Sequence, residues 1–158
     1  MNKLYTLIFC TLFCLPVMAQ DLLMQNGTIN QCTGRFLDSG GTAGNYGNNE
    51  LLVLTICPTT PGELVRVDFT NFNLENNVDF LEIYDGPDVM SPQFGNITGT
   101  TLSNYQATPS NPSGCLTFRF ISTATGTASG WIADISCVVP CQTINSTVDS
   151  TTPVPDGN

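Results

Sequence analysis

The feature that most constrains this chain is a two-residue alternation of apolar and polar side chains, which recurs in its long apolar segments. Alternation by two is the pattern of a strand with one buried face, and no apolar stripe with a helical period reaches a useful length. Short strands separated by Gly, Pro and Asn turns predict an all-β fold, an antiparallel β-sandwich. The expected strands cover residues 51–57, 63–72, 79–86, 115–122 and 131–137.

The first 19 residues have the pattern of a secretory signal peptide, with Lys3 before an apolar stretch and Val17-Met18-Ala19 as the cleavage site. We therefore expect a secreted protein, either extracellular or held at the cell surface. No later apolar run reaches the roughly 18 residues of a membrane helix, so no membrane insertion is expected after cleavage. The cleaved chain has three arginines against thirteen acids, a net charge of −10. This charge disfavours nucleic acid as a partner and favours divalent cations and basic protein surfaces.

Five cysteines follow the signal sequence, and exported chains use cysteine mainly for disulfides. We expect Cys32 to pair with Cys57, which ties the start of the domain to its second strand. Cys115 would then pair with Cys137 and join the last two long strands. Cys141 is left over, and an odd cysteine in a secreted chain suggests a partner elsewhere. Because the chain has no histidine and no CxxC pair, a zinc site is not expected.

These patterns divide the chain into four parts. Residues 1–19 are the signal peptide, 20–31 a lead-in, 32–137 the sandwich, and 138–158 a linker or the start of a further domain. The last part has too few large apolar residues to offset the entropy of ordering. We therefore expect the chain to be a fragment of a longer protein.

The segment Asp38-Ser39-Gly40-Gly41 is similar to the nucleophile region of chymotrypsin-like serine proteases. That chemistry needs a general base, and the chain has no histidine and only one lysine, Lys3, in the segment expected to be removed. The sequence therefore predicts that the protein is not an enzyme. Asp38-Ser39-Gly40 also resembles the catalytic triplet of aspartic proteases, in which two carboxylates share a proton. A dimeric aspartic protease that uses Asp38 from each chain is the corresponding alternative.

Several motifs between residues 32 and 137 together resemble a CUB domain, the extracellular β-sandwich module of complement proteases and developmental metalloproteases. These are the opening Cys32-Thr33-Gly34, the turn Asn45-Tyr46, the central "VDFTNFNLENNVDFLEIYDGP" and the closing pair "LTFRFIS" and "GWIADI". The variant with Asp-Ser-Gly-Gly before Asn-Tyr is most similar to CUB-like domains of bacterial secreted and surface proteins. The resemblance implies a CUB-like jelly roll.

The resemblance also implies a calcium site, because many CUB domains bind Ca²⁺ through acidic loops at one end of the sandwich. Glu75 falls at the first acid of the family, Asp79 at the second, and Tyr46 at the tyrosine that supports them. Thr123 stands where the family has a third acid, and Asp38 is the candidate replacement. Ca²⁺ takes about six to eight oxygen ligands, which suits this donor set. The alternative is that these acids are ordinary solvated turn residues.

Two functions follow as hypotheses. The first is a secreted, non-catalytic recognition module that binds an extracellular protein or glycan through the acidic loops, with Ca²⁺ as the implied cofactor. The second is an accessory domain of a larger secreted hydrolase or adhesin.

Overall fold

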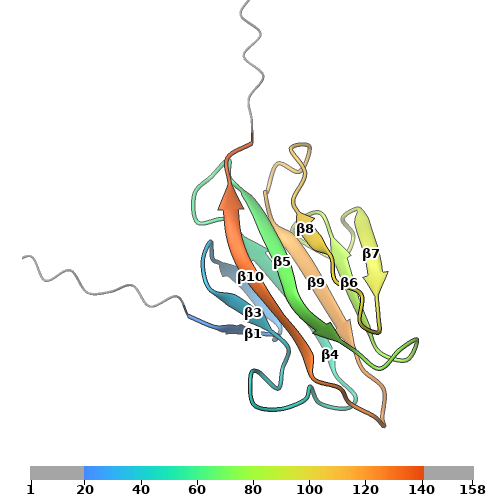
Figure 1. Ribbon diagram of the computed structural model, residues 1–158. Helices are drawn as coiled ribbons and strands as arrows, with labels where there is room; N and C mark the ends of the chain where they lie inside the picture. The colour runs from blue at the N-terminus through green and yellow to red at the C-terminus, as the bar shows by residue number, and fades with distance from the viewer. Residues whose placement is uncertain (1–19, 141–158) are drawn as a thin grey trace, which may run out of the picture.

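The computed structural model describes residues 20–140, and the predicted all-β sandwich is confirmed (Figure 1). Within these residues the chain forms ten strands and no helix, so no helix long and apolar enough to cross a membrane occurs among them. The strands are β1 (Leu22–Leu23), β2 (Gly27–Asn30), β3 (Arg35–Leu37), β4 (Leu51–Cys57), β5 (Leu64–Asn73), β6 (Phe80–Tyr84), β7 (Gln93–Ile97), β8 (Asn104–Gln106), β9 (Leu116–Ile121) and β10 (Gly130–Val138).

The strands form two five-stranded sheets. One sheet has the order β1-β3-β10-β5-β8 and the other β2-β4-β9-β6-β7. Most neighbours are antiparallel, as predicted, but β1 pairs with β3 and β2 with β4 in parallel. Both parallel pairs lie at the edge formed by the N-terminal strands, where a long connection separates the partners instead of a hairpin.

The alternation of the long strands explains how the two sheets form one core. In β5 the predicted inward residues Val65, Val67 and Phe69 are buried, while Thr70 is exposed. Trp131 of β10 is fully buried and its ring lies edge-on to that of Phe120, with the ring centroids 5.2 Å apart. The apolar faces of the two sheets therefore meet, as expected for a sandwich whose outer faces are solvated.

The sandwich begins earlier than the boundary expected at residue 32. The lead-in 20–31 supplies β1 and β2, one strand for each sheet. The apolar pattern also did not predict β3, β7 and β8. These five strands are short or lie at sheet edges, so their apolar alternation is too brief to stand out. The expected signal peptide, Cys141 and most of the expected linker 138–158 lie outside the described residues.

The predicted disulfide connectivity is wrong. The bridges are Cys32–Cys137 and Cys57–Cys115 rather than Cys32–Cys57 and Cys115–Cys137. The reason is strand register: β4 runs antiparallel to β9 with Ile56 opposite Leu116, which places Cys57 beside Cys115. Cys32 instead follows β2 and reaches the last residues of β10, where the amide of Ile135 donates to the carbonyl of Gly34 over 2.9 Å.

The strands thus separate two ends of the sandwich. The disulfide end holds both bridges and the connections 58–63, 85–92 and 107–115. The acidic loop end holds the connections 38–50, 74–79 and 122–129 and lies at the bottom of Figure 1.

Candidate functional site

Three connections meet at the acidic loop end because strands of both sheets finish or begin there. The connection 38–50 passes from β3 in one sheet to β4 in the other, and 74–79 passes from β5 to β6. The connection 122–129 joins β9 to β10 and also crosses between the sheets. Each of the three therefore spans the gap between sheets, and polar groups from both layers come together.

The carboxylate of Asp79 is the centre of this end. Its side chain is fully buried, and Oδ2 accepts a hydrogen bond of 2.6 Å from the hydroxyl of Tyr46. Oδ1 accepts from the backbone amide and the hydroxyl of Thr123, at 2.8 and 3.2 Å. The carboxylate thus joins the connection 38–50 to the connection 122–129. A buried carboxylate with three donors is stable where an unpaired one would not be.

Tyr46, which the resemblance names as the supporting residue, is hydrogen bonded to the side chain of Asp79 and to the backbone of Glu75. Its hydroxyl donates to Asp79 and accepts a bond of 3.0 Å from the backbone amide of Glu75. Burial, followed by the hydrogen bond to Asp79, raises the pKa of Tyr46 to about 12. The hydroxyl therefore keeps its proton and remains a donor at physiological pH. Its ring lies edge-on to Phe120, with the ring centroids 5.0 Å apart.

Glu75 is held differently from Asp79. Its Oε2 atom is buried and has no hydrogen-bond partner among the described residues. The neighbouring backbone is Gly126, whose φ is +86°, and a Cβ at that position would lie 2.1 Å from Oε2. Only glycine leaves room for the carboxylate there. An unpartnered buried carboxylate oxygen is costly and points to a missing donor or cation.

Asp38 does not join this group. Its carboxylate is fully buried and accepts bonds from the backbone amides of Gly40 and Trp131, at 2.8 and 3.1 Å. No hydrogen bond connects it to Glu75, Asp79 or Thr123. Burial raises the pKa of Asp38, while the two amide bonds oppose the rise. A carboxylate enclosed in this way is not placed to share a proton with a second chain, which argues against the aspartic protease alternative.

Glu50 belongs to this end and was not predicted from the sequence. Its Oε2 accepts a bond of 2.6 Å from the hydroxyl of Ser39, and Oε1 accepts from the amide of Gly47. The backbone amide of Glu50 donates to the hydroxyl of Ser122, which in turn donates to the carbonyl of Gly47. Ser39 and Glu50 therefore brace the connection 38–50. The one sequence signal for Glu50 is its charged side chain directly before the apolar segment 51–57, which places it at the end of a strand.

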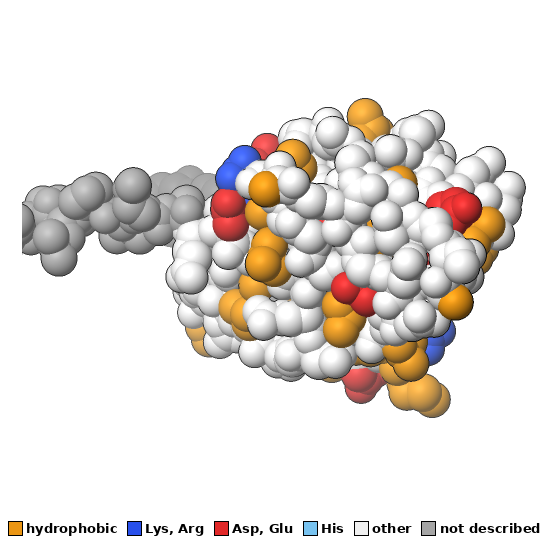
Figure 2. Space-filling view, turned by 90° about the horizontal axis from the view of Figure 1, so that it is seen from below, with side chains coloured by type: hydrophobic (Ala, Val, Ile, Leu, Met, Phe, Trp, Pro, Cys, Tyr) orange, Lys and Arg blue, Asp and Glu red, His pale blue; other side chains and the backbone are white. Residues whose placement is uncertain are grey.

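The described residues provide no cation for these acids. Arg35 pairs with Asp21, Arg66 with Asp68, and Arg119 with Glu82. These are all the arginines of the chain, and Lys3 is not among the described residues. Figure 2, which views the molecule from this end, shows separate red acidic patches, with blue only near the edge of the outline. The local charge is therefore negative and uncompensated, which favours a cation from outside.

The comparisons with known proteins agree with this architecture. The family model described as CUB domain matches residues 27–134. A curated relative, human cubilin, is 38% identical over 94 residues, which are 56% of this chain and 2% of cubilin. The chain therefore spans only a small fraction of the length of that relative.

Two solved structures share the fold. The full extracellular region of zebrafish Gpr126/Adgrg6 matches with a TM-score of 0.60 at 16% identity, over 73% of this chain and 15% of that one. The MASP-1 CUB2 domain bound to Ca²⁺ matches with a TM-score of 0.57 at 19% identity, over 71% of this chain and 98% of that one. With the family model matching most of its length, the chain belongs to the CUB domain family.

Proposed function

We propose that this protein is a secreted, non-catalytic recognition module that binds an extracellular partner through the acidic loop end, with Ca²⁺ ordering that end. CUB domains are typically extracellular interaction modules, which supports the general function. The observation that carries the finer proposal is the buried Oε2 atom of Glu75, which has no partner among the described residues and belongs to the same connection as Asp79, while all three arginines pair with other acids.

The donors at this end fit a hard cation. Glu75 and Asp79 supply carboxylate oxygens, and Thr123 supplies a hydroxyl in the position where the family has a third acid. Bound Ca²⁺ would supply positive charge that neutralises the two acids and fixes the loops that carry them. Because only two carboxylates are present, we expect weak binding, with a dissociation constant on the order of 0.1–1 mM as in other extracellular modules. Asp38 is not part of the proposed ligand set, since its carboxylate accepts the amides of Gly40 and Trp131 and no hydrogen bond joins it to the other candidate ligands.

The partner chemistry follows from the charge of this end. A lysine or arginine side chain of a protein partner would complement the acids that the chain itself leaves uncompensated. A glycan partner would instead use the uncharged hydroxyls and amides of the same connections. The far greater length of cubilin supports a second candidate, an accessory domain of a larger secreted hydrolase or adhesin.

Calorimetric titration of the full chain with CaCl₂ tests the proposal. We expect saturable binding at one site in the wild type and a loss of about tenfold or more in affinity for Glu75→Gln, which removes one charged ligand with little change of shape. Glu63→Gln is the matched control, because Glu63 lies in a connection at the disulfide end. Absence of binding up to about 10 mM Ca²⁺, well above the range of extracellular modules, would remove the metal from the proposal.

A further inference from the structure

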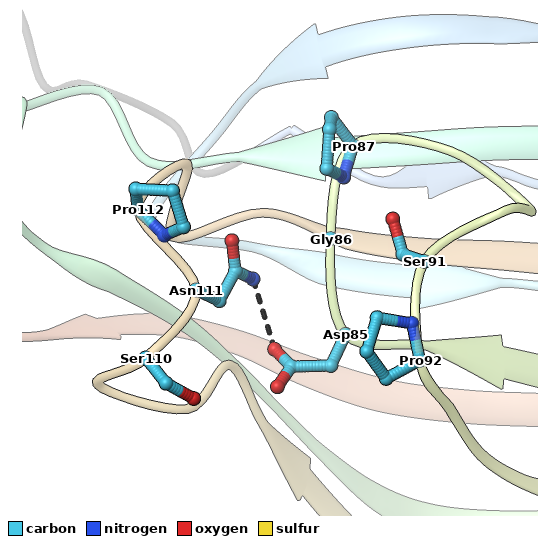
Figure 3. Close-up of a pocket in the computed structure, with 8 residues that line it drawn as sticks. All are labelled: Asp85, Gly86, Pro87, Ser91, Pro92, Ser110, Asn111 and Pro112. Atoms are coloured by element: carbon cyan, nitrogen blue, oxygen red, sulfur yellow. Dashed lines mark hydrogen bonds between the residues drawn. The ribbon is translucent and has the colours of Figure 1, made fainter.

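A pocket with apolar walls and one carboxylate lies at the disulfide end, on the opposite side of the molecule from the acidic loops. It opens between the connection 85–92 and the connection 107–115, and its volume is about 220 Å³ (Figure 3). Its lining combines three prolines, two serines and one carboxylate: Pro87, Pro92, Pro112, Ser91, Ser110 and Asp85. This volume is below the usual size of a small-molecule site, roughly 300–1,000 Å³, and suits a single side chain.

Asp85 is the only charged residue that lines the pocket among the described residues. Its Oδ1 accepts from the amide of Thr108 at 3.0 Å and from Nδ2 of Asn111 at 2.9 Å, the bond drawn in Figure 3. Its Oδ2 accepts from the hydroxyl of Thr108 at 2.6 Å. All three donors are neutral. They satisfy most of the acceptor capacity of the carboxylate but leave its charge without a counter-ion and one lone pair of Oδ2 free.

The residues around the pocket add a second negative charge and no positive one among the described residues. Asp88, in the same connection as Asp85, accepts a hydrogen bond of 3.2 Å from the hydroxyl of Ser91 at the pocket wall. The arginines are all engaged in pairs with other acids, as described above. Two carboxylates therefore act on this pocket with no cation among the described residues to balance them, and a bound cation would gain from both.

The walls favour a cation that has an apolar stem. Pro87, Pro92 and Pro112 offer apolar ring surface, and all three are exposed. A bare metal ion such as Ca²⁺ would need about six oxygen ligands, whereas this pocket offers a single carboxylate. Lysine and arginine side chains place an aliphatic stem on apolar surface and keep their charge at a polar group.

Hydrogen bonds and a disulfide tie the walls of the pocket to the sandwich. Nδ2 of Asn111 bonds both to Asp85 and to the carbonyl of Cys115, the latter at 2.8 Å. Cys115 is in turn bonded to Cys57 at the end of β4. A site whose walls are fixed before binding loses less entropy when a side chain enters it.

We propose that this pocket binds a lysine or arginine side chain of an extracellular protein partner. The charged group pairs with the free lone pair of Asp85 and with the hydroxyl of Ser110, and the stem lies on the proline rings. This site is independent of the acidic loop end, so the module carries two separate places for basic side chains, one at each end of the sandwich.

Nuclear magnetic resonance with ¹⁵N-labelled full chain tests the proposal, using Nα-acetyl-lysine amide and Nα-acetyl-arginine amide as probes. We expect saturable shifts of the amides of Gly86, Ser91, Ser110 and Asn111. Nα-acetyl-citrulline amide has nearly the shape of the arginine probe without its charge, and it should shift these amides about tenfold less. Shifts confined to the amides of 122–129 would report the acidic loop end and would overturn the second site while leaving the first intact.

Two variants separate binding from loop support. Asp85→Asn keeps an oxygen for Thr108 and Asn111, and we expect it to weaken probe binding about tenfold. Ser110→Lys, at an exposed position, places a cation of the chain itself at the mouth and should abolish binding. It also removes the 2.8 Å bond between the hydroxyls of Ser110 and Thr108, so Ser110→Ala, which loses that bond without adding a charge, is its matched control and should keep most of the binding. If neither variant changes the titration, or if no probe shifts these amides, Asp85 only joins the two connections and the proposal is wrong.

Discussion

The two ends of this sandwich are held together by different chemistry. At the disulfide end, Cys32–Cys137 and Cys57–Cys115 fix the chain covalently. At the acidic loop end no covalent bond joins the described connections, and buried carboxylates hold them instead. Asp79 binds Thr123 and Tyr46, and Asp38 binds the amide of Trp131.

This difference indicates which end of the module changes its bonding with pH or with a bound cation. A disulfide holds its geometry at any pH that keeps it oxidised, whereas a carboxylate changes its bonding with protonation or with a bound cation. The acidic loop end can therefore be tuned by solution conditions, while the disulfide end supplies a fixed frame. Three predictions test this contrast.

The largest effect is expected from loss of a disulfide. The double variant Cys57→Ala/Cys115→Ala frees a loop of 58 residues, which costs about 4 kcal/mol in the chain-entropy model. Urea unfolding followed by tryptophan fluorescence measures the loss, since Trp131 is fully buried in the core.

The variant Cys32→Ala/Cys137→Ala opens a loop of 105 residues and should lose a similar or slightly larger amount. A loss below about 1 kcal/mol for either pair would mean that the disulfide end is already rigid without its bridges, and the contrast between the ends would fail.

A smaller effect is expected from two matched glycines, one at each end. Gly126 and Gly62 both have left-handed backbone, with φ of +86° and +89°. Alanine at either position should therefore cost about 1 kcal/mol in backbone strain. Only at position 126 would the new Cβ meet the carboxylate of Glu75, and that flexible side chain must move.

We therefore expect Gly126→Ala and Gly62→Ala to lower the unfolding free energy alike, while only Gly126→Ala weakens Ca²⁺ binding in calorimetry. Equal calcium affinity for the two variants would show that the position of Glu75 is irrelevant to the metal.

The smallest effect is the pH dependence of stability that arises from two carboxylates whose pKa values are shifted in opposite directions. Burial raises the pKa of Asp38 above its ordinary value of 3.8. Between that value and the higher folded value the native state holds more protons, so this contribution to stability falls as pH rises. For Glu82, burial raises the pKa but hydrogen bonds from Arg119 and Tyr84 more than offset it, leaving the pKa below 4.5. Its contribution is present above 4.5 and is lost as pH falls.

Urea unfolding of Asp38→Asn and Glu82→Gln across the acidic range measures these slopes. The stability of wild type relative to Asp38→Asn should decline with rising pH, and relative to Glu82→Gln it should increase. If the stability difference between wild type and variant changed with pH in the same direction for both variants, the opposite pKa shifts of Asp38 and Glu82 would be wrong.

The sequence predicted the long strands well and the short ones poorly. Residues 51–57 were predicted as a strand and form β4 with the same bounds. A run of seven mostly apolar residues is long enough to identify a buried strand from the local sequence. β1, with two residues, and β8, with three, were missed. Strands this short are fixed by pairing with neighbours, which a local pattern does not contain.

Glu75, Asp79, Tyr46 and Thr123 were named as the candidate site from the family resemblance. Hydrogen bonds join Tyr46 to Asp79 and to the backbone of Glu75, and join Asp79 to Thr123, while calcium binding by this group stays a prediction. Asp38 was named as a candidate replacement for the third acid, but its carboxylate accepts the amide of Trp131 on the neighbouring strand β10. The place of Glu50 just before an apolar segment was visible in the sequence, but the partners of Glu50 and Gly126 were not, because the fold alone brings Ser39 and Glu75 near them.

What the sequence determined by itself was the class of fold, since alternation of apolar side chains depends only on neighbours along the chain. The absence of histidine likewise excluded any catalytic site built on that residue. What the tertiary structure decided was which cysteines pair and which carboxylates stay without a partner. Those outcomes depend on the register between strands far apart in sequence, and register is set by the packing of the whole core.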